Sequence, residues 1–150
     1  MATDKDYFRS LLKNQWAKVP LKVEDADTVL DPRWTSTDRE VKDKATGKIF
    51  IKTDRADVQY ALVNGERHVL EKGGTSLHDY AGAMQPSWIW KDFRIPEGTD
   101  VPAGLKIVQR GADVHHYQIE ITAKTMEVTA FQGALDTLVR NAFARMKQLA

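Results

Sequence analysis

Apolar residues at the carboxyl end of the chain follow a helical spacing. From about Glu127 onward they recur at steps of three and four, which places them on one stripe of an α-helix. Thr125 is the expected N-cap, because a hydroxyl there can accept from the free backbone N–H groups of the first turn. The stripe predicts a helix packed on a core formed elsewhere in the chain; its members are Val128, Phe131, Leu135, Leu138, Val139, Ala142, Met146 and Leu149.

Short segments rich in β-branched and aromatic residues precede this helix, and turn residues separate them, which predicts strands. Asn64-Gly65 stands between two such segments and predicts a hairpin. Residues 96–104 contain two prolines and two glycines and predict a loop. Strands followed by a closing amphipathic helix indicate the α+β class. The expected strands are 48–53, 67–71, 90–95, 105–109 and 115–122.

The amino end is ambiguous. Tyr7, Phe8, Leu11, Leu12 and Trp16 fit one helical face, so the local pattern favours a helix over 4–16. Residues 24–43 are polar with scattered apolar positions and predict mostly loop.

Composition narrows the class of protein. With 150 residues, 42% hydrophobic and 29% charged, residues 1–150 are expected to form one domain with its own core. The 22 basic and 21 acidic residues are spread along the chain, which disfavours nucleic acid as the main ligand and a membrane as partner. The absence of cysteine excludes thiolate chemistry and suits a reducing cytosol. No apolar run reaches the length of a signal core, so export without a cleaved signal peptide is expected.

One short segment concentrates polar chemistry. Gly73 to Asp79 holds two glycines, then Thr75 and Ser76, then a histidine and an aspartate. Glycines let backbone approach a ligand closely, and the hydroxyls can hold a polar group. The same run is typical of a turn that leads into a capped helix, and the pattern alone favours that interpretation.

Histidines do not predict a metal site. Neighbouring residues on a strand point to opposite faces, so His115 and His116 cannot share one ion, and no metal is expected. A serine-hydrolase elbow needs a glycine two residues after the serine, where this chain has His78 after Ser76.

Strand parity brings His116, Gln118 and Glu120 to one face of the expected strand 115–122. Such a polar row is usually the solvated face of a sheet, and the pattern alone favours this. The alternative is the wall of a cleft, in which these side chains meet Thr75 and Ser76 around a polar ligand.

Four ordered motifs run through the second half of the chain: Gly73-Gly74-Thr75-Ser76 with Asp79 and Gly82, Ile95 to Pro102 continuing through Gly104 to Val108, His116-Tyr117, and Leu135-Asp136 with Val139 to Ala142. Through these motifs, from Gly73 to about Arg145, the chain resembles the small ADP-ribosyltransferase-like toxins delivered by the bacterial type VI secretion system. Tyr7-Phe8-Arg9 resembles the first strand of that family, which carries an arginine, so the resemblance predicts a strand there in place of a helix. His78 stands where the family has a phenylalanine.

The resemblance implies an ADP-ribosyltransferase-like mixed or antiparallel β core, with the helix packed on it. It also implies an enzyme that transfers ADP-ribose from NAD to a target or hydrolyses NAD, without a metal. Breaking the bond between nicotinamide and ribose passes through an oxocarbenium-like state, so the enzyme must grip the dinucleotide and stabilise positive charge on the sugar.

Residue roles follow from the same resemblance. Arg9 would hold phosphate or ribose oxygens with its fork of donors, and Glu120 is the expected carboxylate that contacts the ribose and stabilises the cation. His116 would bond ribose or phosphate. The implied NAD-binding residues are Arg9, Gly73, Gly74, Thr75 and Ser76, and the implied catalytic residues are Thr75, Ser76, His116 and Glu120.

The resemblance further implies a toxin that inhibits the growth of bacterial or eukaryotic competitors. It would reside in the producer's cytoplasm beside a cognate immunity protein, leave with a secretion-apparatus carrier and act in the target cytoplasm. Two alternatives stay open. One is a ribonuclease toxin using His68, His116 and a lysine, and the other is a non-enzymatic protein-binding domain.

Overall fold

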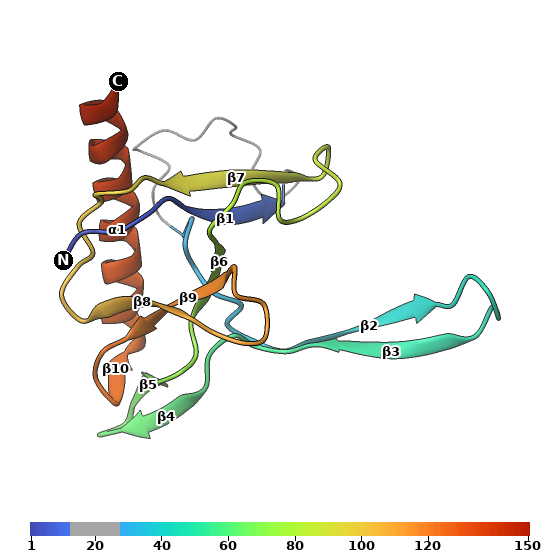
Figure 1. Cartoon of the computed structure of the whole chain (residues 1–150). Helices are drawn as coiled ribbons and strands as arrows, with labels where there is room; N and C mark the ends of the chain where they lie inside the picture. The colour runs from blue at the N-terminus through green and yellow to red at the C-terminus, as the bar shows by residue number, and fades with distance from the viewer. Residues whose placement is uncertain (13–27) are drawn as a thin grey trace.

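The computed structural model describes residues 1–12 and 28–150. Its main layer is a five-stranded sheet in the order β7-β1-β6-β9-β8, with every neighbouring pair antiparallel. The helix α1 (Val128–Leu149) packs across one face of this sheet (Figure 1). The five strands are β1 (Tyr7–Leu12), β6 (Thr75–His78), β7 (Trp90–Ile95), β8 (Leu105–Gln109) and β9 (His116–Ile121).

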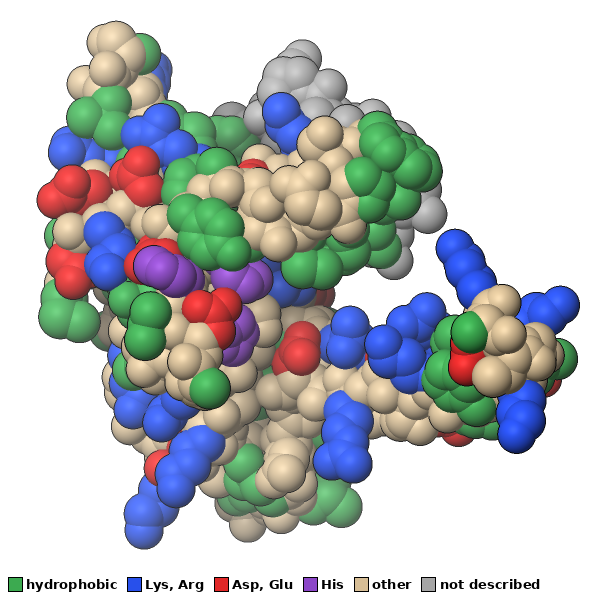
Figure 2. Space-filling view, turned by 45° about the vertical axis from the view of Figure 1, so that its right-hand side comes forward, with side chains coloured by type: hydrophobic (Ala, Val, Ile, Leu, Met, Phe, Trp, Pro, Cys, Tyr) green, Lys and Arg blue, Asp and Glu red, His purple; other side chains and the backbone are tan. Residues whose placement is uncertain are grey.

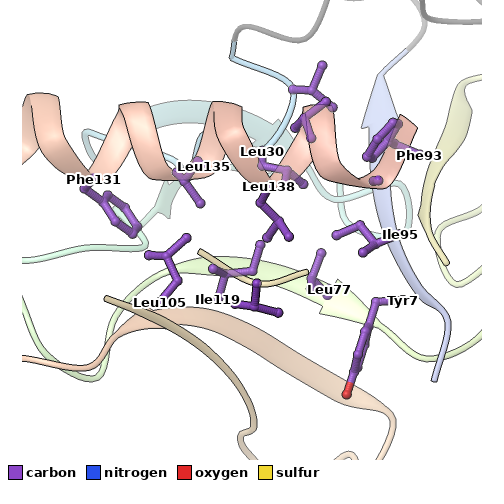
Figure 3. Packing of buried hydrophobic residues seen from close by; sticks show 14 of the residues in the cluster. Tyr7, Leu30, Leu77, Phe93, Ile95, Leu105, Ile119, Phe131, Leu135 and Leu138 are labelled. Carbon is purple, nitrogen blue, oxygen red and sulfur yellow. The ribbon is translucent and has the colours of Figure 1, made fainter. Parts of the chain in front are cut away.

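The predicted helical stripe forms the centre of the core. Phe131, Leu135 and Leu138 of α1 are fully buried and point toward the sheet (Figure 3). Among the side chains that pack with them from the sheet are Leu77, Ile95, Leu105 and Ile119. The α+β prediction and the helix are therefore confirmed.

The predicted N-cap is wrong. Thr125 belongs to a short strand, β10 (Thr125–Glu127), where it lies opposite Leu70. The backbone of β10 pairs with β5 as far as Glu127, so the helix begins only at Val128. It has no side-chain hydrogen bond at its N-cap.

The predicted hairpin is confirmed within a second sheet, β10-β5-β4. Asn64 and Gly65 join β4 (Tyr60–Val63) to β5 (Glu66–Leu70) and have φ angles of 52° and 80°. Two positive φ angles are what a type I′ turn requires, and asparagine and glycine tolerate them best. The predicted strands 90–95 and 105–109 also have their expected bounds, and 96–104 forms no named strand.

The amino-terminal segment is a strand, as the family resemblance predicts, and the helix over 4–16 is wrong for its described residues. Tyr7 lies opposite Ile95 and Leu12 opposite Trp90, so β1 pairs with β7 along its whole length. Tyr7 and Leu11 are buried together, since a separation of four residues returns to the same face in a strand as well as in a helix. Residues 13–16 of that prediction lie outside the described residues.

The loop prediction for 24–43 is wrong over its last part. β2 (Thr37–Lys42) and β3 (Ile49–Asp54) form a separate two-stranded sheet that projects from the body (Figure 1). β2 carries no apolar alternation because both of its faces are largely exposed. Residues 24–27 lie outside the described residues.

The segment from Gly73 to Asp79 forms no helix cap; its centre is the strand β6. Both glycines lie against protein backbone. A Cβ on Gly74 would overlap the carbonyl oxygen of Ile119, and one on Gly73 would come 2.6 Å from the carbonyl oxygen of Asp57. The glycines therefore permit close packing of neighbouring chain segments.

Candidate active site

A cleft of about 740 Å³ opens where β1 and β6 diverge. In the described chain these strands pair at a single position, Phe8 opposite His78. The volume is within the range of small-molecule sites. The lining residues come from β1, β6, β9, the segment 28–34, the stretch around 84–90 and the connection between β3 and β4. They include Arg9, Ser10, Asp31, Arg33, Trp34, Asp57, Ser76, His78, Met84, Trp90 and His116.

Arg9 joins two walls of the cleft. Its Nη1 donates to the carbonyl oxygen of Ser76 at 3.1 Å and its Nη2 to that of Asp31 at 2.9 Å. Burial lowers the pKa of the guanidinium from its ordinary value, and the nearby Asp57 and Asp31 carboxylates oppose that shift. The buried Nε has no hydrogen-bond partner among the described residues. The hydrogen bonds of the described residues therefore leave this donor of Arg9 unsatisfied.

Ser76 and His116 form a hydrogen-bonded pair in the cleft. His116 Nδ1 lies 3.0 Å from the carbonyl oxygen of Arg110, which can only accept, so this nitrogen carries a proton. In the neutral ring Nε2 is then the acceptor, and Ser76 Oγ, 3.2 Å away, donates to it. Because the Ser76 hydroxyl donates its hydrogen to His116, its oxygen can act toward a ligand only as a hydrogen-bond acceptor or as a partner of positive charge.

His78 lies beside His116, with ring centroids 5.7 Å apart. Burial lowers the pKa of His78, and the neighbouring His116 lowers it further, because a second positive charge would be repelled. The cleft therefore favours a neutral His78 near pH 7. In Figure 2 the histidine side chains, in purple, lie close together on the side of the molecule that faces the viewer.

An acidic and aromatic wall faces Arg9. Trp34 Nε1 donates to Asp31 Oδ2 at 3.1 Å, which fixes the carboxylate. The other oxygen, Oδ1, is buried without a hydrogen-bond partner among the described residues. Trp34 itself stands edge-on to Phe131 of the core, with ring centroids 6.0 Å apart. Asp31 thus presents an acceptor and a negative charge on a rigid support.

Thr75 lies beneath the cleft wall. It is fully buried, and its hydroxyl donates to the carbonyl oxygen of Leu30 at 2.5 Å. Leu30 belongs to the segment that supplies Asp31 and Trp34, so Thr75 holds this wall in position. Gly73 and Gly74 do not line the cleft either.

Glu120 does not line the cleft. Its side chain is 1% exposed, and it binds Arg110 through two oxygens, with Nε–Oε2 at 2.7 Å and Nη2–Oε1 at 2.8 Å. The solvated face predicted for this strand is wrong at Glu120, because the arginine side chain covers the carboxylate. Of the sequence-predicted site residues, the cleft therefore brings together Arg9, Ser76 and His116.

The adjacent histidines have different partners, and His115 lies in the turn before β9. His115 bonds Asp79 through Nδ1 at 2.8 Å and does not line the cleft. Among residues 1–12 and 28–150 no group of three His, Asp or Glu side chains could hold a metal ion. Nor does any helix of these ranges have the length and apolar character to cross a membrane.

Comparison with known proteins identifies the family. Residues 5–146 match the family model described as Tse2 ADP-ribosyltransferase toxin. The chain belongs to this family. It is also 39% identical over 84 residues to Toxin Tse2 of Pseudomonas aeruginosa, a match covering 53% of this chain and 51% of that protein. The chain thus spans about half the length of the curated relative it matches.

Membership of the Tse2 family confirms the resemblance to small ADP-ribosyltransferase-like toxins. It does not by itself assign the cleft residues, several of which sequence reasoning missed. Asp31 and Trp34 lie in a stretch with a loop-like pattern, and His78 departs from the expected phenylalanine. The lone arginine at 110 carried no motif, and only the structure pairs it with Glu120.

Removing Arg110 tests the buried ion pair. Arg110→Ala leaves the Glu120 carboxylate buried without its charge partner, which is costly because the carboxylate cannot regain its hydration. Arg39→Ala is the matched control, since it breaks the exposed Arg39–Asp54 pair at 3.0 Å, where side chains stay hydrated. Urea unfolding should give a clearly lower midpoint for Arg110→Ala than for Arg39→Ala. Equal midpoints would show that Glu120 does not depend on Arg110.

Proposed function

We propose that this chain is a toxin domain, formed by residues 1–150, that consumes NAD by transferring its ADP-ribose to a target or to water. The observation that carries this is the convergence of Arg9, Ser76 and His116 on one cleft. Two buried atoms of cleft residues, Arg9 Nε and Asp31 Oδ1, have no hydrogen-bond partner in the described part of the chain, which adds support. Because unpaired buried polar atoms are costly, a polar ligand that supplies both an acceptor and a donor would be favoured.

The charges of the cleft suit a dinucleotide. Arg9 and Arg33 bring two positive guanidinium groups to the cleft, and positive charge favours the phosphates. Trp34 and Trp90 offer flat apolar walls to a base or to the pyridinium ring. The Asp31 carboxylate favours the positive charge of the nicotinamide ring and of the sugar cation that follows.

The proposed reaction breaks the bond between the ribose C1′ and the nicotinamide nitrogen, and the electron pair leaves with nicotinamide. Positive charge develops on the ribose, and Ser76 Oγ, its proton directed to His116, presents lone pairs to that charge. A water or an acceptor hydroxyl or amine then bonds to C1′ and loses a proton. Neutral His116 can take that proton through Ser76 or directly.

The structure supports a different distribution of roles from the one implied by the resemblance. Asp31 replaces Glu120 as the proposed carboxylate, because Asp31 lines the cleft and Glu120 is bound by Arg110. Thr75 acts as a positioning residue through Leu30. Gly73 and Gly74, which have no side chain, allow the chain leading into β6 to lie close to the backbone of Asp57 and Ile119.

The biological setting is proposed from the family name. We expect action in the cytoplasm of a target cell, restraint by an immunity protein in the producer, and delivery by a secretion-apparatus carrier. NAD is the substrate, and the proposed chemistry requires no metal.

The ribonuclease alternative loses its acid–base pair. His68 lies on β5 in the three-stranded sheet, opposite Glu127, and does not line the cleft that contains His116. A non-enzymatic domain remains an outcome of the test below.

NAD labelled in the nicotinamide, and separately in the adenylate, tests the proposal. Purified protein is incubated with each label, with and without cell extract. Release of nicotinamide alone indicates hydrolysis, and macromolecular adenylate label indicates transfer. Ser76→Ala should lower the rate by about 100-fold, as expected for losing one transition-state contact, while the exposed Ser87→Ala should not. If folded wild-type protein yields neither product, the proposal that it consumes NAD is refuted.

A further inference from the structure

The β2–β3 sheet, here called the arm (residues 37–54), is the most exposed part of the described fold. Every side chain of β3 from Ile49 to Thr53 is exposed. Ile49 is 65% exposed, Phe50 50% and Ile51 60%. Among the described residues neither strand pairs with a third one. A two-stranded ribbon of this kind is marginally stable in water by itself, so the apolar side chains and free edges suit a partner.

Strand register separates the two faces of the arm. Val41 lies opposite Phe50 and Arg39 opposite Lys52, so these four side chains share one face. Ile49 and Ile51 lie on the other face, opposite Lys42 and Glu40. A strand that paired with the free edge of β3 would therefore meet Phe50 and Lys52 on one face and Ile49 and Ile51 on the other.

Two basic side chains meet on the Phe50 face of the arm. Residues 37–54 as a whole carry five basic and four acidic side chains. Arg39 and Lys52 stand directly opposite each other, a like-charge pair that destabilises a hairpin. Asp54 binds Arg39 at 3.0 Å, but Lys52 has no ion-pair partner in residues 1–12 or 28–150. An incoming carboxylate beside Lys52 would relieve this repulsion.

We propose that the arm docks an extended acidic segment of a protein partner, which adds as a third strand to the free edge of β3. Main-chain hydrogen bonds would supply affinity, and alternate side chains would supply specificity. Acidic residues of the segment would lie beside Lys52 and Phe50, and apolar residues beside Ile49 and Ile51. The residues of this site do not line the cleft, so the proposal does not depend on whether the protein consumes NAD.

The features of the arm favour a protein strand over other polyanions. Asp38 and Glu40 lie on the Ile49–Ile51 face, where a phosphate backbone or an anionic membrane would be repelled. Figure 2 shows both blue and green side chains on the projecting arm. An alternating acidic and apolar strand matches both faces at once.

Binding of a defined peptide to the full chain tests the proposal. The probe is a labelled heptapeptide that alternates glutamate and valine, and its reference replaces every glutamate with lysine. Fluorescence anisotropy should detect the glutamate peptide, with affinity falling as salt rises. Lys52→Glu should lower the affinity for the glutamate peptide at least tenfold. Lys124→Glu, which makes the same charge change at an exposed position off the arm, should leave that affinity unchanged.

Further variants keep the result interpretable. Ile51→Asp should also weaken binding, and an unchanged thermal midpoint in each variant shows that the body of the fold is intact. Equal binding of the lysine peptide, or equal losses in Lys52→Glu and Lys124→Glu, would overturn the proposal. So would preferential binding of the wild-type protein to phosphatidylserine vesicles or to oligothymidylate, or self-association through the arm in sedimentation experiments.

Discussion

Alanine in place of Gly74 should destabilise the protein by about 3 kcal/mol or more, as expected when an added methyl group meets backbone that cannot move aside. The new Cβ would overlap the Ile119 carbonyl oxygen and come within 3.4 Å of the Glu120 Cα. Ile119 is fully buried in the core, and Thr75, the residue after Gly74, lies directly opposite it in the ladder. Relief would require β6 and β9 to separate.

The matched control is Gly133→Ala. Gly133 lies inside α1, and apart from its neighbours and the helix's own backbone no described atom stands within 4 Å of the Cβ it would gain. Alanine there should raise stability by about 0.5–1 kcal/mol, because glycine has the greater backbone entropy to lose in a helix. Urea unfolding of both variants measures the contrast. A Gly74→Ala variant as stable as wild type would mean that β6 and β9 do not approach as closely as described.

The elements that sequence predicted best are those whose signals are local. The stripe of α1 repeats over five turns or more, and Asn64-Gly65 specifies its own turn through two positive φ angles. The amino end lacked such a signal, because Tyr7 and Leu11 share a face in a helix and in a strand alike. Pairing with β7, some eighty residues later in the sequence, decided between them.

The candidate site divides in the same way. Strand parity placed His116 on the face where it bonds Ser76, whereas His115 lies in the turn before β9 and bonds Asp79. Parity could not tell whether Glu120 would meet a ligand or Arg110, because that depends on how the chain turns after β8. Asp31 and Trp34 reach the cleft through a loop fixed by Thr75, a contact across 45 positions of sequence. No local pattern encodes such a contact.

His116→Ala should reduce NAD consumption by about 100- to 10,000-fold, the range expected for loss of a group that handles protons in the transition state. Without the ring, Ser76 loses the acceptor of its proton, and the cleft loses the base whose tautomer is fixed by the Arg110 carbonyl. The hydroxyl can then rotate, and its lone pairs are no longer held toward the developing cation.

His115→Ala is the matched control, because it removes a neighbouring imidazole that is 57% exposed and bonds Asp79 outside the cleft. It should leave the rate within about twofold, while the thermal midpoints of both variants stay near that of wild type because both rings lie outside the core. Growth of a host that expresses each variant without an immunity protein gives a second readout, in which only His116→Ala should relieve toxicity. Equal rates for the two variants would remove His116 from the reaction and leave it a structural residue of β9. A loss of activity that accompanies unfolding in His116→Ala alone would lead to the same conclusion.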